Sequence, residues 1–243
     1  MTRLLQDWVT EQAERRPHAT AVVSGATRLT YAELDTRPTQ VAGMLAESGG
    51  KRFDRVALVM PTSAAALIGL FGIYKAGCIY VPLDPASPSS RLRKILDSCE
   101  SRLVLAGGPV SPALKELFQD EDRRSRLRLG WLDRAMPAGE DLAAEFTLDD
   151  VIAHPAAAPG IRNGSHDPSH ILFTSGSTGM PKGVVLSHAN VIHFIDWATR
   201  FFGMDASDRA CAHPPLHFDM SMLDIFSMPA VGAQLHLIPR DLS

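Results

Sequence analysis

The chain has 243 residues, of which 45% are hydrophobic and 21% are charged, proportions typical of a globular protein. Its formal net charge of −3 argues against a basic nucleic-acid groove or a basic membrane patch. Three widely separated cysteines form neither a disulfide framework nor a zinc site, and they favour a reducing compartment. The acidic, amphipathic start is no signal peptide, and the longest apolar run is too short to span a bilayer. We therefore expect a cytoplasmic protein with neither nucleic-acid nor membrane partners.

The first elements in chain order are a helix and two short strands. Hydrophobic spacing predicts a helix over residues 4–13 that stops near Pro17. Strands are expected at residues 19–24 and 29–30, and Tyr31 begins the next helix. Pro38 lies inside the apolar pattern of that helix, where proline removes a hydrogen bond at a cost of about 3 kcal/mol. We expect the helix to break at Arg37 and to restart with Pro38 in its first turn.

Strands and helices then alternate. Strands are expected at residues 55–60, 79–83 and 102–106. A helix capped by Thr62 and ending before Gly77 follows the first of them, and a helix over residues 88–98 follows the second. This alternation predicts an α/β fold in which mainly parallel β-sheets are flanked by helices.

The pattern weakens between residues 109 and 145. The charged run at residues 119–128 is expected to be a solvated surface excursion. Residues 153–169 are rich in Ala, Pro and Gly, so we expect a linker or long surface loop between a first part, 1–152, and a second part, 170–243. In the second part, strands are expected at 171–173, 183–187, 208–213 and 233–238, and helices at 191–202 and 220–229.

The strongest chemical signal is the segment TSGSTGMPKG, from Thr174 to Gly183. Small residues let backbone N–H groups approach an anion, hydroxyls add donors, and lysine adds a positive charge, so the segment suits a polyphosphate. It is not a Walker A loop, because Pro181 precedes the lysine and a strand is expected after it. Composition alone leaves phosphate binding and a plain turn between strands equally open.

The residues LFTSGSTGMPKGV resemble the phosphate-loop signature of the adenylate-forming superfamily, which includes acyl-CoA ligases, luciferase-like enzymes and nonribosomal peptide synthetase adenylation domains. Three further segments resemble family motifs in the same order: LTYAEL at 29–34, YKAGCIYVPLD at 74–84 and FDMS at 218–221. The chain is most similar to the amino-acid adenylation domains. The resemblance implies a ligase that uses ATP and Mg²⁺ to convert an amino acid into its aminoacyl-AMP. It also implies transfer of the aminoacyl group to an acyl or peptidyl carrier protein, or to CoA.

The resemblance also assigns roles to individual residues. Thr174 and Lys182 are implied as catalytic residues, and the phosphate-binding set is Thr174, Ser175, Gly176, Ser177, Thr178, Gly179 and Lys182. No metal ligand is implied, because the family's magnesium-binding glutamate has no counterpart before Ser243. The ribose-binding aspartate and the C-terminal lid also have none. The chain therefore corresponds to the N-terminal portion of the family's large domain, and we expect this piece alone to be inactive.

Asp219 has two interpretations. The resemblance places it where amino-acid-activating members carry an aspartate that pairs with the substrate ammonium, and Met220 and Leu223 align with positions that line the side-chain pocket. The alternative is that Asp219 caps the following helix. Four motifs in order favour substrate recognition, and the two roles can coexist. His217 is interpreted as structural, with a place at the substrate entrance as the alternative.

The remaining candidates are interpreted as structural. Cys78, Cys99 and Cys211 lie in apolar sequence and are expected to be buried, inert thiols. His188, His193 and His213 do not have the spacing of a metal site. Two rival functions remain: an acyl-CoA ligase for a plain carboxylic acid, against which Asp219 argues, and a non-catalytic module that binds nucleotide or docks a carrier protein.

Overall fold

The computed structural model describes residues 3–109, 111–133, 136, 142–157, 159–175 and 180–238. The strands in these residues are β1 (Thr20–Ser24), β2 (Thr27–Thr30), β3 (Arg55–Val59), β4 (Ile79–Leu83), β5 (Leu103–Ala106), β6 (Arg128–Trp131), β7 (Phe146–Thr147), β8 (Pro168–Thr174), β9 (Lys182–Ser187), β10 (Arg209–Ala212) and β11 (Gln234–Leu237). The helices are α1 (Asp7–Arg15), α2 (Tyr31–Glu47), α3 (Ala64–Lys75), α4 (Ser89–Ser98), α5 (Pro112–Gln119), α6 (Glu121–Arg124), α7 (Leu148–Ala153), α8 (His188–Phe202) and α9 (Ser221–Val231). None of the described helices is long and apolar enough to cross a membrane.

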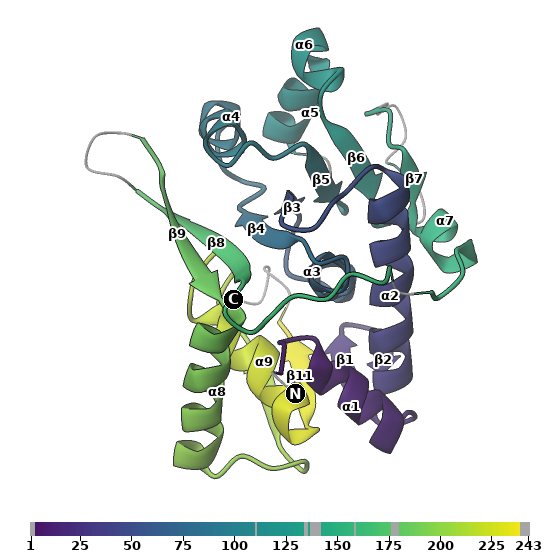
Figure 1. The fold of residues 1–243 in the computed structure, drawn as a ribbon, viewed down its shortest axis with the longest axis vertical. Helices are drawn as coiled ribbons and strands as arrows, with labels where there is room; N and C mark the ends of the chain where they lie inside the picture. Colours follow the sequence, from purple (N-terminus) through teal and green to yellow (C-terminus); the bar gives the residue numbers. More distant parts are fainter. Residues whose placement is uncertain are drawn as a thin grey trace.

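The larger sheet has the strand order β7-β6-β5-β3-β4-β8-β9. Its neighbouring strands are parallel except at one edge, where β9 runs antiparallel to β8. The expectation of an α/β fold with a mainly parallel sheet is confirmed. Figure 1 shows the β8–β9 hairpin extending away from the body of the molecule at this edge.

The smaller sheet has the order β10-β11-β1-β2 and joins the two ends of the described chain. β1 pairs antiparallel with β2 and parallel with β11. The buried Tyr31 hydroxyl, at the start of α2, donates a hydrogen bond of 2.6 Å to the Ala233 carbonyl oxygen. Each sheet therefore contains strands from both predicted parts of the chain, and the boundary at residues 153–169 remains a prediction.

The central strands are buried on both faces, which explains their continuous apolar sequence. On β3, Val56 and Leu58 belong to one hydrophobic cluster, whereas Ala57 and Val59 belong to the other, because successive side chains point to opposite faces. The first cluster also contains side chains from α2, α3 and α9, and the second contains side chains from α4 and α5. These helices hold β4 and β8 in place beneath the candidate site.

The expected break in α2 is absent, because the helix runs through Pro38 without interruption. Pro38 is buried against α3. The proline removes the N–H that would bond to the Leu34 carbonyl oxygen. The neighbouring Asp35 carbonyl oxygen accepts bonds from Thr39 Oγ1 at 2.8 Å and from Lys75 Nζ of α3 at 3.0 Å. α3 approaches closely because Gly72 has no side chain: a Cβ there would lie 2.5 Å from Val41 Cγ1. Tertiary contacts therefore offset the cost of an internal proline.

Two smaller expectations also need correction. Ser63, not Thr62, caps α3, because the Ser63 hydroxyl accepts the Ala66 N–H at 3.1 Å. The charged run at 119–128 is not an excursion away from the fold: it contains α6 and begins β6. Arg123 in this run holds Asp97 of α4 through two bonds of 2.8 Å.

The loop between α7 and β8 lies against the body of the molecule. Asn163 is buried, and its side chain donates to the Gly77 carbonyl oxygen at 3.3 Å and accepts from Arg52 Nε at 3.0 Å. Arg52 also bridges to Asp167 at 2.7 Å. These contacts fix the path of the chain into β8, the strand that leads to the candidate site.

Candidate active site

The predicted phosphate loop connects β8 to β9 at the edge of the larger sheet. Thr174 and Lys182 face each other as the last pair of the hairpin, and the Thr174 hydroxyl lies 3.5 Å from the Lys182 carbonyl oxygen. Thr174, Ser175 and Lys182 are all exposed. Gly176, Ser177, Thr178 and Gly179 lie outside the described residues. The described part of the hairpin thus presents two hydroxyls and an ammonium at the mouth of the loop.

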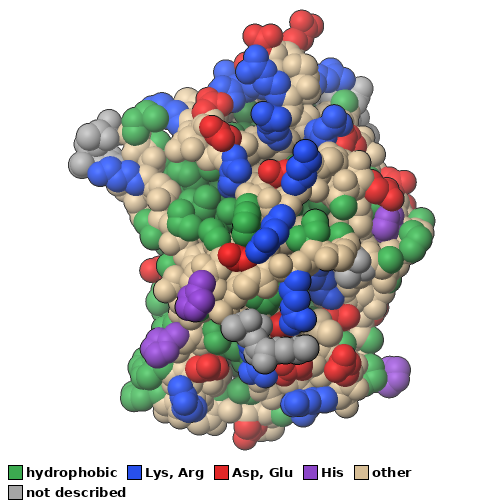
Figure 2. Space-filling view, viewed as in Figure 1, with side chains coloured by type: hydrophobic (Ala, Val, Ile, Leu, Met, Phe, Trp, Pro, Cys, Tyr) green, Lys and Arg blue, Asp and Glu red, His purple; other side chains and the backbone are tan. Residues whose placement is uncertain are grey.

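A cleft of about 670 Å³ lies beside this hairpin. Its walls come from the end of β4 with the start of α4, from the ends of β8 and β9, and from the segment at residues 217–219. Figure 2 shows apolar side chains gathered on this face between the hairpin and α4. The volume lies within the usual range for sites that bind small molecules, about 300–1,000 Å³. Thr174 and Ser175 therefore share one cleft with Asp219.

Asp219 is exposed in the cleft and does not cap α9. The helix begins at Ser221, its N-cap position is Met220, and no side chain caps it. Asp219 Oδ1 instead accepts the N–H of the adjacent Met220 at 2.8 Å. The segment is further held by the Ser221 hydroxyl, which donates to the Phe218 carbonyl oxygen at 2.7 Å. The helix-cap interpretation of Asp219 is therefore wrong.

The other predicted substrate residues are less closely associated with the cleft. Met220 has 55% of its surface exposed, Leu223 is half-buried, and neither lines the cleft. His217 does line it, with its ring 4.7 Å from that of Phe218. The roles of Met220 and Leu223 in a side-chain pocket remain predictions.

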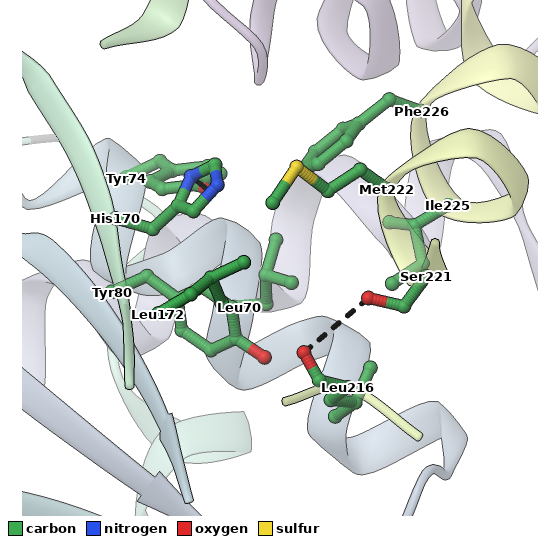
Figure 3. Close-up of a pocket in the computed structure, with 10 residues that line it drawn as sticks. All are labelled: Leu70, Tyr74, Tyr80, His170, Leu172, Leu216, Ser221, Met222, Ile225 and Phe226. Atoms are coloured by element: carbon green, nitrogen blue, oxygen red, sulfur yellow. Dashed lines mark hydrogen bonds between the residues drawn. The ribbon is translucent and has the colours of Figure 1, made fainter. Parts of the chain in front are cut away.

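Beneath the cleft lies a cavity of about 10 Å³, large enough for about one water molecule (Figure 3). Leu172 of β8 lines both the cleft and this cavity. Ser221 lies on the α9 side, where its hydroxyl is also 3.3 Å from the Leu216 carbonyl oxygen. Tyr80 and His170 lie on the side of the sheet. Among the described residues, Tyr80 Oη and His170 Nε2 have no hydrogen-bond partner.

This cavity adjoins a buried aromatic cluster that the sequence analysis did not identify. Tyr74 Oη lies 3.3 Å from His170 Nδ1, and the Tyr74 ring lies 5.3 Å from that of His188. Burial lowers the pKa of His170 to about 3 and the pKa of His188 to about 4. Both histidines are therefore neutral near pH 7. His170 lines the small cavity, whereas His188 lines neither the cavity nor the cleft. The only available sequence signal was the density of aromatic residues in YKAGCIYVP and SHILF.

The thiols divide into two groups. Cys78 and Cys99 are buried, as expected, and burial raises the pKa of Cys78 to about 12 and also raises the pKa of Cys99. Cys211 is exposed, contrary to expectation, because it lies on β10 at the edge of the smaller sheet. None of the three lines the cleft, so they provide no nucleophile there.

Among the described residues, no three His, Cys, Asp or Glu side chains gather closely enough to hold a metal ion. The carboxylates that line the cleft are those of Asp84 and Asp219. These residues alone therefore do not fit a protein-bound Mg²⁺, although the hydroxyls and the lysine suit the phosphates of ATP.

Comparison with known proteins identifies the family of the chain. A model of the AMP-binding enzyme family matches residues 9–243. The L-proline–[L-prolyl-carrier protein] ligase of Pseudomonas fluorescens is 33% identical over 241 residues, covering 99% of this chain and 46% of that protein. Syringomycin synthase SyrB1 of Pseudomonas syringae pv. syringae is 31% identical over 243 residues, covering 98% of this chain and 35% of that protein. The chain thus spans less than half the length of these curated relatives.

Solved structures give the same picture. The nonribosomal peptide synthetase FmoA3 superposes with a TM-score of 0.79 at 30% identity over 98% of this chain and 23% of that chain. Its AMPPNP-bound form gives the same TM-score at 32% identity. The N-terminal domain of FACL13 from Mycobacterium tuberculosis has a TM-score of 0.84 at 23% identity, over 98% of this chain and 57% of that chain, a likeness of fold.

Proposed function

The chain belongs to the AMP-binding enzyme family, and on this premise we propose that it forms the phosphate- and substrate-binding part of an amino-acid-activating ligase. The observation that carries the proposal is that Asp219 lines the same cleft as Thr174 and Ser175 and does not cap a helix. Two hydroxyls suited to phosphate and a carboxylate suited to an ammonium thus line one ligand-sized cleft. The similarity to a prolyl-carrier-protein ligase supports the proposal.

In the proposed reaction, a carboxylate oxygen of the amino acid attacks the α-phosphorus of ATP. The bond from that phosphorus to the bridging oxygen breaks, and pyrophosphate leaves with the electron pair. Lys182 neutralises charge on the departing pyrophosphate, and the Thr174 and Ser175 hydroxyls donate hydrogen bonds to its oxygens. Positioning and charge stabilisation of this kind account for most of the catalysis in phosphoryl-group chemistry.

Asp219 would select the amino acid. An amino acid brings an ammonium group that can pair with the exposed carboxylate, whereas a plain carboxylic acid leaves Asp219 without a partner in a closed site. The acceptor thiol would come from outside this chain, because burial raises the pKa of both Cys78 and Cys99, and Cys211 lies away from the cleft. We propose the phosphopantetheine thiol of a carrier protein as that acceptor.

One observation favours a second candidate, an acyl-CoA ligase for a plain carboxylic acid. The α4 wall of the cleft presents Leu92 and Ile95, and the hairpin presents Phe173 and Val184. Such apolar walls suit an acyl or aryl group as well as an apolar amino-acid side chain. The two candidates differ in whether an ammonium group is required.

The deciding experiment is ATP–pyrophosphate exchange by the full-length gene product, with a panel of amino acids and their des-amino analogues. The proposal predicts exchange with at least one amino acid and at least about ten times less with its des-amino analogue. Equal or faster exchange with the des-amino analogues would favour the acyl-CoA ligase. Absence of exchange with every carboxylic acid, although the protein is folded and binds nucleotide, would favour a non-catalytic module.

A further inference from the structure

We propose that Arg91, on the α4 wall of the cleft, binds a phosphate group of a molecule that occupies the cleft. Arg91 lies in the first turn of α4, is half-buried and lines the same space as Thr174, Ser175 and Asp219. This second anion contact is separate from the phosphate loop, and the proposal rests on the proposed function.

The guanidinium of Arg91 makes no hydrogen bond or ion pair with any described residue, although Arg91 is half-buried. Arg93, two residues along the same helix, behaves differently. It bridges to Glu116 Oε1 at 3.2 Å and lies 3.8 Å from Asp120 Oδ2. Arg93 is therefore engaged in holding α4 to α5, whereas the donors of Arg91 are available to a ligand.

The charges along the cleft also favour this role for Arg91. Among the described residues that line the cleft, Arg91 is the one lysine or arginine, and it faces a space that also contains the carboxylates of Asp84 and Asp219. Lys182, at the end of the hairpin, does not line the cleft, so Arg91 is the cation that the described lining itself offers to an anionic ligand. A planar guanidinium presents paired N–H donors that match phosphate oxygens, and such bonds are stronger than neutral hydrogen bonds.

The phosphate has two possible sources in the proposed reaction. One is the nucleotide bound at Thr174 and Ser175, and the other is the phosphopantetheine arm, or CoA, that brings the acceptor thiol. Both offer the same chemistry to Arg91, so the experiment separates them with ligands that carry or lack the group.

The test uses the full-length gene product with R91A and R91K, and with R93A as the matched control on the same helix. Titration calorimetry measures the Kd of a non-hydrolysable ATP analogue, and separately the Kd of CoA and of phosphate-free pantetheine. These binding measurements need no turnover, so they remain informative even if the proposed amino-acid activation fails.

If the nucleotide is the source, R91A raises the Kd of the ATP analogue about 10-fold or more, R91K raises it less, and R93A leaves it unchanged. If the acceptor is the source, R91A raises the Kd of CoA about 10-fold while pantetheine binding is unchanged. Wild-type affinities in R91A for both the analogue and CoA would overturn the proposal. It would also be overturned if R93A weakened binding as much as R91A, because the effect would then come from the helix.

Discussion

The central strands and the β8–β9 hairpin belong to the same sheet but differ in burial. Every residue of β4 is buried, whereas the first four residues of β9 are exposed. Val184 and Val185 of β9 keep 48% and 57% of their surface exposed, although valine is a residue that usually favours the core. The central strands therefore contribute to the buried core, whereas the start of β9 exposes its side chains to solvent.

α8 shows the same contrast between its two faces. Val191, Ile195 and Ala198 form its buried stripe. Trp197 and Phe201 stack outside it with ring centroids 5.2 Å apart, and Phe201 keeps 68% of its surface exposed. Aromatic side chains gathered at a surface mark a region that contacts another molecule or segment. We therefore expect substitutions in the central strands to lower the free energy of unfolding, and substitution of Lys182 in the hairpin to lower activity.

The largest expected effect on stability is in the central strands. Leu58→Ala removes a fully buried side chain from β3, a central strand of the larger sheet. We expect the free energy of unfolding to fall by about 2–5 kcal/mol in urea denaturation. A loss below about 1 kcal/mol would contradict the assignment of the core to this region.

Lys182→Ala tests the hairpin through activity. Lys182 is exposed and makes no ion pair with a described residue, so its removal should leave the unfolding free energy within about 0.5 kcal/mol of wild type. Loss of a charged contact in the transition state typically costs about 2–4 kcal/mol, which lowers kcat/KM of adenylation about 30- to 1,000-fold. Unchanged exchange kinetics would make the loop a plain turn.

The buried histidines predict a pH dependence. Burial lowers the pKa of His170 to about 3 and of His188 to about 4, below the value of 6.5 in an unfolded chain. The unfolded chain therefore binds more protons below pH 6.5, so stability is full above that pH and is lost as pH falls toward 4.

His170→Phe checks this dependence. The variant keeps an aromatic ring beside Tyr74 and Tyr80 but cannot titrate. Its free energy of unfolding should therefore fall less between pH 7 and pH 5 than that of the wild type. If the unfolding free energies of the two proteins, measured in urea, fell equally with pH, His170 would not contribute to the pH dependence of stability.

The smallest expected effect is at the exposed strand. Val185→Ser removes an apolar side chain that is already 57% exposed, so the unfolding free energy should change by no more than about 0.5 kcal/mol. A loss comparable to that of Leu58→Ala would show that the hairpin is as important to the fold as the central strands.

Most of the fold could be predicted because its strands are short, apolar runs separated by caps and glycines. The same reasoning failed where two residues were chemically equivalent or where tertiary contacts decided. Thr62 and Ser63 are both able to cap a helix, and only the backbone path selects Ser63. Pro38 remains inside α2 because contacts with α3 outweigh a local penalty.

Less of the candidate site than of the fold could be predicted from the sequence. The phosphate loop has a recognisable order of residues, so its place between two strands could be predicted. Arg91 has no such pattern, because a lone arginine on an amphipathic helix looks like any solvated charge until its neighbours are known. His170 and His188 are 18 positions apart in the chain, and only the fold brings both to Tyr74.

The most direct test of the account is Asp219→Ser in the full-length gene product. The substitution removes the charge but keeps a small polar residue beside α9, whose end Asp219 does not cap, so melting should be near wild type. The account predicts that kcat/KM for the amino acid in ATP–pyrophosphate exchange falls at least about 10-fold, while the des-amino analogue gains relative to it. An unchanged preference for the amino acid would contradict the proposed role of Asp219 and favour a plain carboxylic acid as substrate.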